Sequence, residues 1–273
     1  MPEAKDDLQR TFTKGIAQNY DHYLGPAWFG PIARDLARRL PADPGGDVLE
    51  VACGTGLMTQ GLRERLDSRR RLVATDLSPP MLDYARDKLA NVRGIEWMKA
   101  DALDLPFAEG DFAALACSLG VMFPADKQRL FAEFHRVLRP GGLLLFNVWD
   151  RLEENTCVRV YSEVIEELFP GDPEMQFTLP YSMSDTGRLR ELVLAAGFAE
   201  PKIEKVPITV TGKAREIAIG QVRGTPRGLL LTQRGVDLED AIDKVAAALE
   251  RAGESRTGFS APGRVIAVEA IKR

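Results

Sequence analysis

Two glycines and two aspartates in the first half of the chain have the types and spacing to hold a ribose-containing cofactor. Gly54 and Gly56 end the run VLEVACGTG, residues 48–56, and glycine lets the backbone approach a ligand closely. The helix expected next points its first amide groups at the same place. Asp76 ends a second apolar run, and Asp101 follows a third. An acidic side chain at the end of a second strand can accept hydrogen bonds from both ribose hydroxyls, so the pattern predicts such a site.

Two kinds of cofactor compete for this site. A dinucleotide-binding G-x-G-x-x-G motif would place a third glycine where Thr59 stands. Glu50 lies in the expected strand, where it would repel phosphates but would interact favourably with a cationic sulfonium or ammonium group. These residues favour a cationic cofactor, and a nicotinamide-dependent oxidoreductase is the alternative.

Short apolar runs alternate with amphipathic stretches through the first 150 residues, at the spacing of βαβ units. The runs are apolar throughout, as in parallel strands that are covered on both faces. We expect a doubly wound, mostly parallel α/β sheet of seven strands, with its ligand site beyond the carboxyl ends of the strands. The first five strands are expected at 48–52, 71–75, 95–98, 112–117 and 143–148, with helices at 58–66, 79–90 and 127–138.

The second half is less regular. Helices are expected at 158–168 and 186–196, with two more between 213 and 260, of which 238–252 is the clearer. Strands are expected at 202–210 and 265–271, and a loop at 169–180. We expect a single domain over residues 1–273, made of an N-terminal lid (1–45), a cofactor-binding core (46–150), and the remaining strands with acceptor-pocket insertions (151–273).

Four segments resemble the class I S-adenosylmethionine-dependent methyltransferases, in particular the type 11 branch with the ubiquinone/menaquinone biosynthesis C-methyltransferases. They are VLEVACGTG, ATDLSPPMLDYA, ADALDLPFAEGDFAALACSLGVMFP and EFHRVLRPGGLLLFNVW, in this order, within about residues 15–150. The resemblance implies S-adenosylmethionine as cofactor and S-adenosylhomocysteine as product. It also implies methyl transfer to a small molecule.

The resemblance also implies roles for individual residues. The turn at Ala52, Gly54 and Gly56 would pack against the methionine moiety, and Glu50 would suit its positive charge. Asp76 would hold the ribose and Asp101 would reach the adenine amino group. The remaining implied contacts are Leu77 and Met81 flanking the adenine, Ala102 and Leu103 against its ring, and the backbone near Cys117 and Ser118 at the amino-acid end.

The N-terminal segment NYDHYLGP, residues 19–26, resembles the lid of this family. Tyr20 would cover the cofactor and touch its carboxylate; packing of Tyr20 and Tyr23 between the lid and the sheet is the alternative. His22 is the candidate catalytic base if the acceptor must lose a proton, because the histidine pKa is near neutral. A surface or packing role is the alternative for His22, and His135 is expected to be structural.

Apolar and aromatic residues are expected to line the acceptor pocket, which favours a small hydrophobic or aromatic acceptor. The candidates are residues 119–123, Trp149, Phe169, Phe177, Tyr181 and the region 213–235, with Asp150 and Glu153 at the border. C-, O- and N-methylation all stay open. Residues 213–260 either cap this pocket or mediate a homodimer. A protein of this fold that binds the cofactor without turnover is a further alternative.

The composition and charge of the chain argue against several other classes of function. A net charge of −4 does not suit a surface that neutralises phosphates, so nucleic acid is not an expected partner. No run approaches the about 18 apolar residues of a membrane span. Three cysteines without a C-x-x-C pair, and only two histidines, indicate neither a disulfide framework nor a metal site. A cytoplasmic location is therefore expected.

Overall fold

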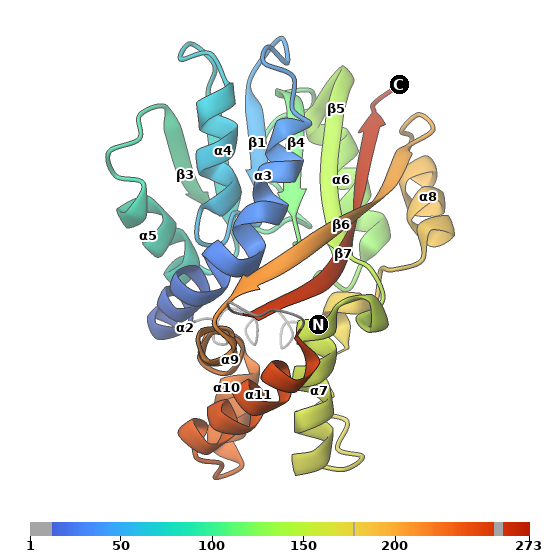
Figure 1. Ribbon diagram of the computed structural model, residues 1–273. Helices are drawn as coiled ribbons and strands as arrows, with labels where there is room; N and C mark the ends of the chain where they lie inside the picture. Colours follow the sequence, from blue (N-terminus) through green and yellow to red (C-terminus); the bar gives the residue numbers. More distant parts are fainter. Residues whose placement is uncertain (1–12, 177, 254–258) are drawn as a thin grey trace.

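The computed structural model describes residues 13–176, 178–253 and 259–273 (Figure 1). A seven-stranded sheet in the order β3-β2-β1-β4-β5-β7-β6 forms its centre. The strands are β1 (Val48–Val51), β2 (Leu72–Asp76), β3 (Ile95–Lys99), β4 (Phe112–Ser118), β5 (Leu138–Trp149), β6 (Lys202–Gly212) and β7 (Phe259–Ile271). β7 runs antiparallel to β5 and β6, whereas β1 to β5 pair in parallel. The predicted doubly wound, mostly parallel seven-stranded sheet is confirmed.

Helices cover both faces of the sheet and extend beyond its carboxyl edge. α2 (Lys14–Asn19), the π-helix η1 (Tyr20–Phe29) and α3 (Gly30–Arg38) come first, followed by α4 (Leu57–Arg65), α5 (Pro79–Lys88), α6 (Lys127–Val137) and α8 (Thr186–Ala195). A separate helical layer lies below the sheet in Figure 1. It contains α7 (Thr156–Leu168), α9 (Ala214–Arg223), α10 (Arg227–Gln233) and α11 (Leu238–Ala252).

Alternating side chains of the strands pack into two different cores. Val48 of β1 contacts the cluster formed with α3 and α4, whereas Leu49 and Val51 join the larger cluster that includes α6 and α7. This alternation follows from the two-residue repeat of a strand. The two edge strands β3 and β6 are less buried than the inner strands, because each has a neighbouring strand on one side only.

Several expected boundaries were wrong; β7, for example, begins at Phe259 instead of Val265. The helix expected to reach Leu138 ends at Val137, and β5 begins at Leu138 instead of Leu143. The Pro140–Gly142 stretch belongs to the strand, although Gly141 has a left-handed φ of 74°, because it pairs with Lys272. The Gly141 N–H donates to the Lys272 carbonyl and the Lys272 N–H donates to the Gly142 carbonyl, both at 2.9 Å. This pairing with the C-terminal end of the chain is a long-range contact that the local sequence does not show.

The described part of the region 213–260 contains three helices rather than the two expected. Gly224 ends α9, and Pro226 precedes the first residue of α10, so a short break separates them. The segment 169–180 is largely irregular, as expected, and ends in a short 3-10 helix, Leu179–Tyr181. None of the helices in the described ranges is both long and apolar enough to cross a membrane.

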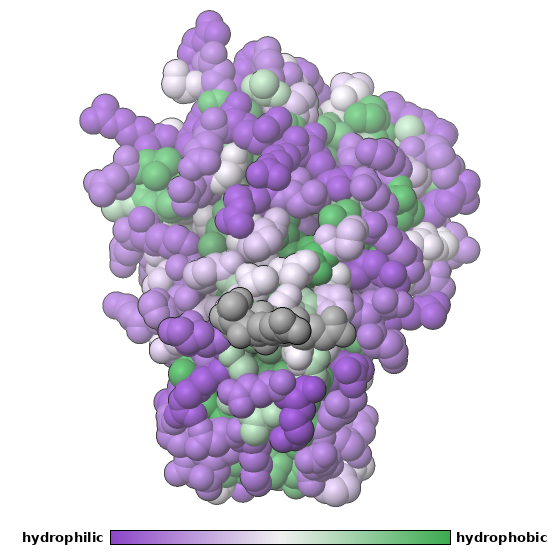
Figure 2. All heavy atoms as spheres, in the orientation of Figure 1, coloured by the Kyte–Doolittle hydropathy of each residue, from purple (hydrophilic) through white to green (hydrophobic). Residues whose placement is uncertain are grey.

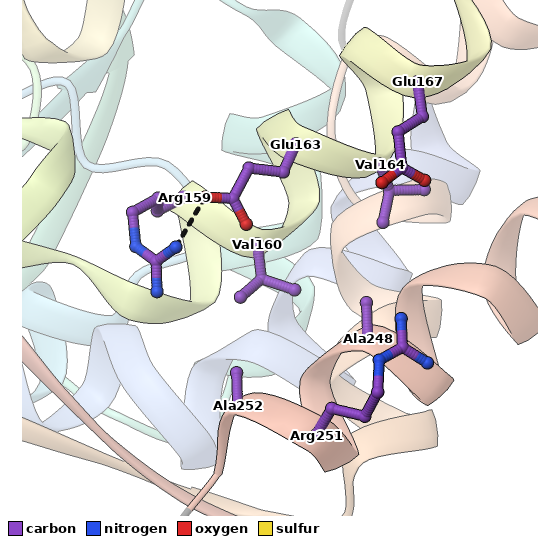
Figure 3. Close-up of a pocket in the computed structure, with 8 residues that line it drawn as sticks. All are labelled: Arg159, Val160, Glu163, Val164, Glu167, Ala248, Arg251 and Ala252. Atoms are coloured by element: carbon purple, nitrogen blue, oxygen red, sulfur yellow. Dashed lines mark hydrogen bonds and ion pairs between the residues drawn. The ribbon is translucent and has the colours of Figure 1, made fainter.

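The molecular surface in the view of Figure 2 is mainly hydrophilic, with small scattered hydrophobic patches. A shallow pocket of about 230 Å³ lies between α7 and α11 (Figure 3). Its rim is charged, and Arg159 and Glu163 form an ion pair there at 2.5 Å. Among the described residues, this pocket contains no residue of the sequence motifs and no buried polar atom that lacks a hydrogen-bond partner.

Candidate functional site

A cavity of about 620 Å³ lies at the carboxyl ends of β1, β2, β4 and β5, between the sheet, the lid and the junction of α9 and α10. Eleven of the thirteen residues expected at the cofactor line it. They are Tyr20, Ala52, Gly54, Asp76, Leu77, Met81, Asp101, Ala102, Leu103, Cys117 and Ser118. Parallel strands bring their carboxyl ends to one edge, which explains why residues so far apart in sequence meet here.

The turn after β1 leaves an open cradle. Ala52 and Gly54 have left-handed φ angles of 56° and 55°. A Cβ added at Gly54 would meet nothing within 4 Å, so its open side can receive a ligand. Gly56 plays a different part from the one expected. It does not line the cavity, and a Cβ there would come within 3.2 Å of α5 at Ala85, so this glycine allows close packing of the turn on α5.

Asp76 connects the turn to the cavity. Its Oδ2 accepts a hydrogen bond from the Gly54 N–H and its Oδ1 accepts one from the Ser78 N–H, both at 2.8 Å. Burial raises the pKa of the carboxyl group, and these backbone donors oppose that shift. Each carboxylate oxygen can accept more than one hydrogen bond, so Asp76 retains acceptor capacity for hydroxyl groups of a ligand.

Glu50 does not line the cavity, contrary to expectation. It shares a strand face with Val48 and is fully buried on the side of the sheet that α4 covers. Burial raises its pKa to about 8, a shift that the nearby Thr59 hydroxyl opposes and Asp76 increases. Within the described residues neither carboxyl oxygen makes a hydrogen bond of normal geometry. Any influence of Glu50 on a bound cation therefore acts across the turn rather than by contact.

The loops after β3 and β4 complete this end of the cavity. The Asp101 Oδ1 accepts a hydrogen bond from the Leu103 N–H at 2.9 Å, which fixes a tight turn. After β4, Leu119 adopts a left-handed φ of 52°, and its N–H donates to the Asn147 Oδ1 at 2.9 Å. A Cβ at Gly120 would lie 2.6 Å from the Ala52 Cβ and 2.7 Å from the Cys117 Sγ, so the β1 and β4 turns are in close contact.

Tyr20, the first residue of the π-helix η1, lines the cavity. Its ring stacks on Phe29 at 4.4 Å between centroids, and burial raises the pKa of its hydroxyl. His22 is exposed and is absent from the cavity lining; its ring meets Tyr23 edge-on at 4.6 Å. Residues two apart in a helix do not share a face, so His22 points away from the side that carries Tyr20. The geometry gives no support to His22 as a base.

Some of the residues expected at the acceptor pocket line the cavity and others do not. Trp149 and Tyr181 line the cavity, Phe169 does not, and Phe177 lies outside the described residues. Asp150 is fully buried away from the lining and pairs with Arg264 at 2.5 Å and Lys205 at 3.2 Å.

Glu153 is exposed and does not border the cavity either. The expected structural role of His135 fits its edge-to-face contact with Phe198.

Several residues that line the cavity were not predicted from the sequence. Trp28 and Phe29 extend the aromatic wall, and Trp28 lies 5.3 Å from Trp149 between ring centroids. α7 and the α9–α10 junction add Val158, Tyr161, Gln221 and Arg227. The only signal in the sequence was the apolar stripe of each helix, which does not tell a cavity wall from a core.

Comparisons with known proteins show the family of the chain. The family model described as "Methyltransferase domain" matches residues 48–142. The ubiquinone/menaquinone biosynthesis C-methyltransferase of Teredinibacter turnerae is 31% identical over 170 residues, which are 58% of this chain and 68% of that protein. Its counterpart in Marinomonas sp. is 33% identical over 130 residues, 46% of this chain and 52% of that protein. The chain spans about half to three-fifths of the length of the first curated relatives it matches.

Solved structures share the fold. The phosphoethanolamine N-methyltransferase 2 of Haemonchus contortus superposes with a TM-score of 0.65 at 16% identity, covering 98% of this chain and 60% of that one. A possible histamine N-methyltransferase of Thermotoga maritima gives 0.57 at 18% identity, covering 97% and 100%.

The chain therefore belongs to the class I S-adenosylmethionine-dependent methyltransferases. Within that family it fits the branch with the ubiquinone/menaquinone C-methyltransferases, and the cofactor of the family is S-adenosylmethionine. This membership leaves the nicotinamide oxidoreductase alternative without support.

Proposed function

We propose that the protein transfers the methyl group of S-adenosylmethionine to a small hydrophobic or aromatic acceptor. The observation that carries the proposal is the continuity of one cavity. Its polar end holds Asp76 and Asp101 beside the open Gly54 turn, and its other end is walled by rings, among them Trp149 and Tyr181. A donor and an acceptor bound in such a cavity can meet without intervening water.

The residues present fit this cofactor. The Asp76 carboxylate would accept the ribose hydroxyls, and the Gly54 cradle would receive the methionine moiety together with Ala52 and the backbone at Cys117 and Ser118. Tyr20 would close the site from the lid. The adenine would lie among Leu77, Met81, Ala102 and Leu103, with its amino group at Asp101.

The protein's own contribution to the reaction is alignment. When bound, S-adenosylmethionine supplies a methyl group activated on a sulfonium centre. The stacked Tyr20 and Phe29, with Trp149 edge-on to Phe29 at 5.9 Å, form a rigid wall that fixes an acceptor ring and excludes water. Neither histidine lies in the cavity lining. The mechanism that fits is therefore positioning of donor and acceptor without a histidine base.

The names of the relatives indicate which acceptors to test first. Several are C-methyltransferases of ubiquinone or menaquinone biosynthesis, or demethylmenaquinone methyltransferases. A demethylated quinol is therefore the first acceptor to test, followed by phenols and aromatic amines.

The test is transfer of label from methyl-tritiated S-adenosylmethionine into this acceptor panel. We expect a labelled organic product with at least one class and no product without protein. Tight S-adenosylhomocysteine binding with no transfer to any class would contradict the proposed activity and favour a cofactor-binding protein without turnover.

A further inference from the structure

An arginine side chain lies at the apolar end of the cavity. Arg227, the first residue of α10, lines the cavity and is only 4% exposed. Its guanidinium carbon lies 4.9 Å from the centre of the Tyr161 ring, in cation–π geometry. Its two terminal nitrogens donate to the Ser162 hydroxyl at 3.3 and 3.4 Å, which ties α10 to α7. These contacts hold the guanidinium in a defined place in the wall.

Two further buried polar groups line the same end. Tyr161 and Gln221 are each 3% exposed, and both line the cavity. Among the described residues, the Tyr161 hydroxyl and the Gln221 Oε1 have no hydrogen-bond partner of normal geometry. The Gln221 Nε2 donates to the Cys157 carbonyl at 2.8 Å, which fixes the orientation of the amide. Buried polar groups are rarely left unpaired, so the Tyr161 hydroxyl, which can donate, indicates a polar ligand group here. The Gln221 Oε1 can only accept a hydrogen bond and does not contribute to binding an anion.

The protonation states define the ligand chemistry. Burial raises the pKa of Tyr161, a shift that the nearby Arg227 charge and Thr225 hydroxyl only oppose, so the phenol stays protonated and can donate. Burial lowers the pKa of Arg227, but arginine starts so high that the guanidinium stays charged at neutral pH. A fixed positive charge and a hydroxyl donor together suit an anionic oxygen. Their attraction for it is strengthened by the low dielectric of the apolar wall.

We propose that the α10 end of the cavity is a subsite for an anionic oxygen group on the acceptor, a carboxylate or a phosphate, held by Arg227 and Tyr161. The acceptor would then have an apolar or aromatic body along Trp149 and Tyr181 and a charged end at Arg227. The inference rests on the proposed function, because it assigns a substrate class to the same cavity.

Matched probe pairs test the subsite. The first pair is 1-hydroxy-2-naphthoate and 1-hydroxy-2-naphthamide, and the second is 2-naphthyl phosphate and 2-naphthol. Each is titrated calorimetrically into the full chain saturated with S-adenosylhomocysteine. We expect at least one anionic probe to bind tenfold or more tightly than its neutral partner, and the pair that shows the preference tells carboxylate from phosphate. Equal affinities within both pairs, or no binding of either anion, would overturn the proposal.

Substitutions show which residues cause the preference for the anionic probe. Arg227→Met is expected to remove the preference for the anion, and Tyr161→Phe to reduce it about threefold to tenfold. Arg223→Met is the matched control, because Arg223 pairs with Glu239 at 2.7 Å and does not line the cavity. Arg227→Lys, which keeps the charge without the planar fork, serves if the methionine variant does not fold, and it is expected to keep only part of the preference.

A separate S-adenosylhomocysteine titration of each protein keeps the two proposals apart. Normal cofactor binding without an anion preference would contradict the subsite alone. Absence of S-adenosylhomocysteine binding by the unaltered chain would contradict the proposed function. Weakened cofactor binding in Arg227→Met, with the anion preference intact, would assign Arg227 to the cofactor and overturn its role at the acceptor.

Discussion

Replacing Asp76 with alanine is the sharpest perturbation of the cofactor end of the cavity. The carboxylate performs two tasks in the structure. It accepts hydrogen bonds from the Gly54 and Ser78 amides at 2.8 Å, and it lines the cavity that the ribose would fill. Asp76→Ala removes the ligand bonds and also releases the Gly54 amide that shapes the open turn.

The magnitude follows from the chemistry of the lost bonds. A hydrogen bond to a charged group contributes about 1.5–3 kcal/mol, and partial replacement by water lowers the net loss. We therefore expect Asp76→Ala to weaken S-adenosylhomocysteine binding by about 1–3 kcal/mol, which corresponds to roughly 5- to 150-fold in the dissociation constant.

Isothermal titration with S-adenosylhomocysteine measures this change, and thermal unfolding of the free proteins shows whether the variant is folded. Asp83→Ala is the control, because Asp83 is an exposed carboxylate of α5 that pairs with Arg86 at 2.7 Å outside the cavity. A folded Asp76→Ala protein with the affinity of the unaltered chain would refute the ribose assignment.

Two more perturbations test how the turn is built. The pKa of Glu50 is raised to about 8 from 4.5, so its protonated form stabilises the fold fully below about pH 4.5, and this contribution is lost as the pH rises through about 8. Glu50→Gln should therefore show a flatter unfolding midpoint against pH across that window than the unaltered chain, and identical profiles would show the idea to be wrong. Gly120→Ala places a Cβ 2.6 Å from the Ala52 Cβ, so it should destabilise the protein by the about 1–3 kcal/mol typical of overpacking, measured by urea unfolding. Gly15→Ala, whose Cβ would meet only the Thr13 hydroxyl at 4.0 Å, is its control, and equal stabilities of the two variants would contradict the close contact.

The cofactor end of the cavity was largely predictable because its residues follow strands. Asp76 ends β2 and Asp101 lies two residues after β3, and parallel pairing then brings both to one edge of the sheet. The alternation of a strand could also have placed Glu50 correctly, since it shares a face with Val48 and not with Leu49. The motif shows that an acidic residue is present and the alternation shows that it faces away from Leu49, but only the packing of α4 shows that this side is buried.

The acceptor end was not predictable in the same way. Tyr161, Gln221 and Arg227 come from α7, α9 and α10, and they meet only because these helices pack together beyond the sheet. No spacing rule connects positions 161 and 227, and an arginine after a proline is ordinarily a solvated helix start. Trp149 was found because it ends β5, where the strand rule still applies.

The most direct test of the central claim is a calorimetric titration of the full chain with S-adenosylhomocysteine, with NADH titrated in parallel. We predict saturable binding of S-adenosylhomocysteine with micromolar affinity and no heat of binding from NADH. Binding of NADH with no response to S-adenosylhomocysteine would contradict the assignment of this cavity to the methyltransferase cofactor.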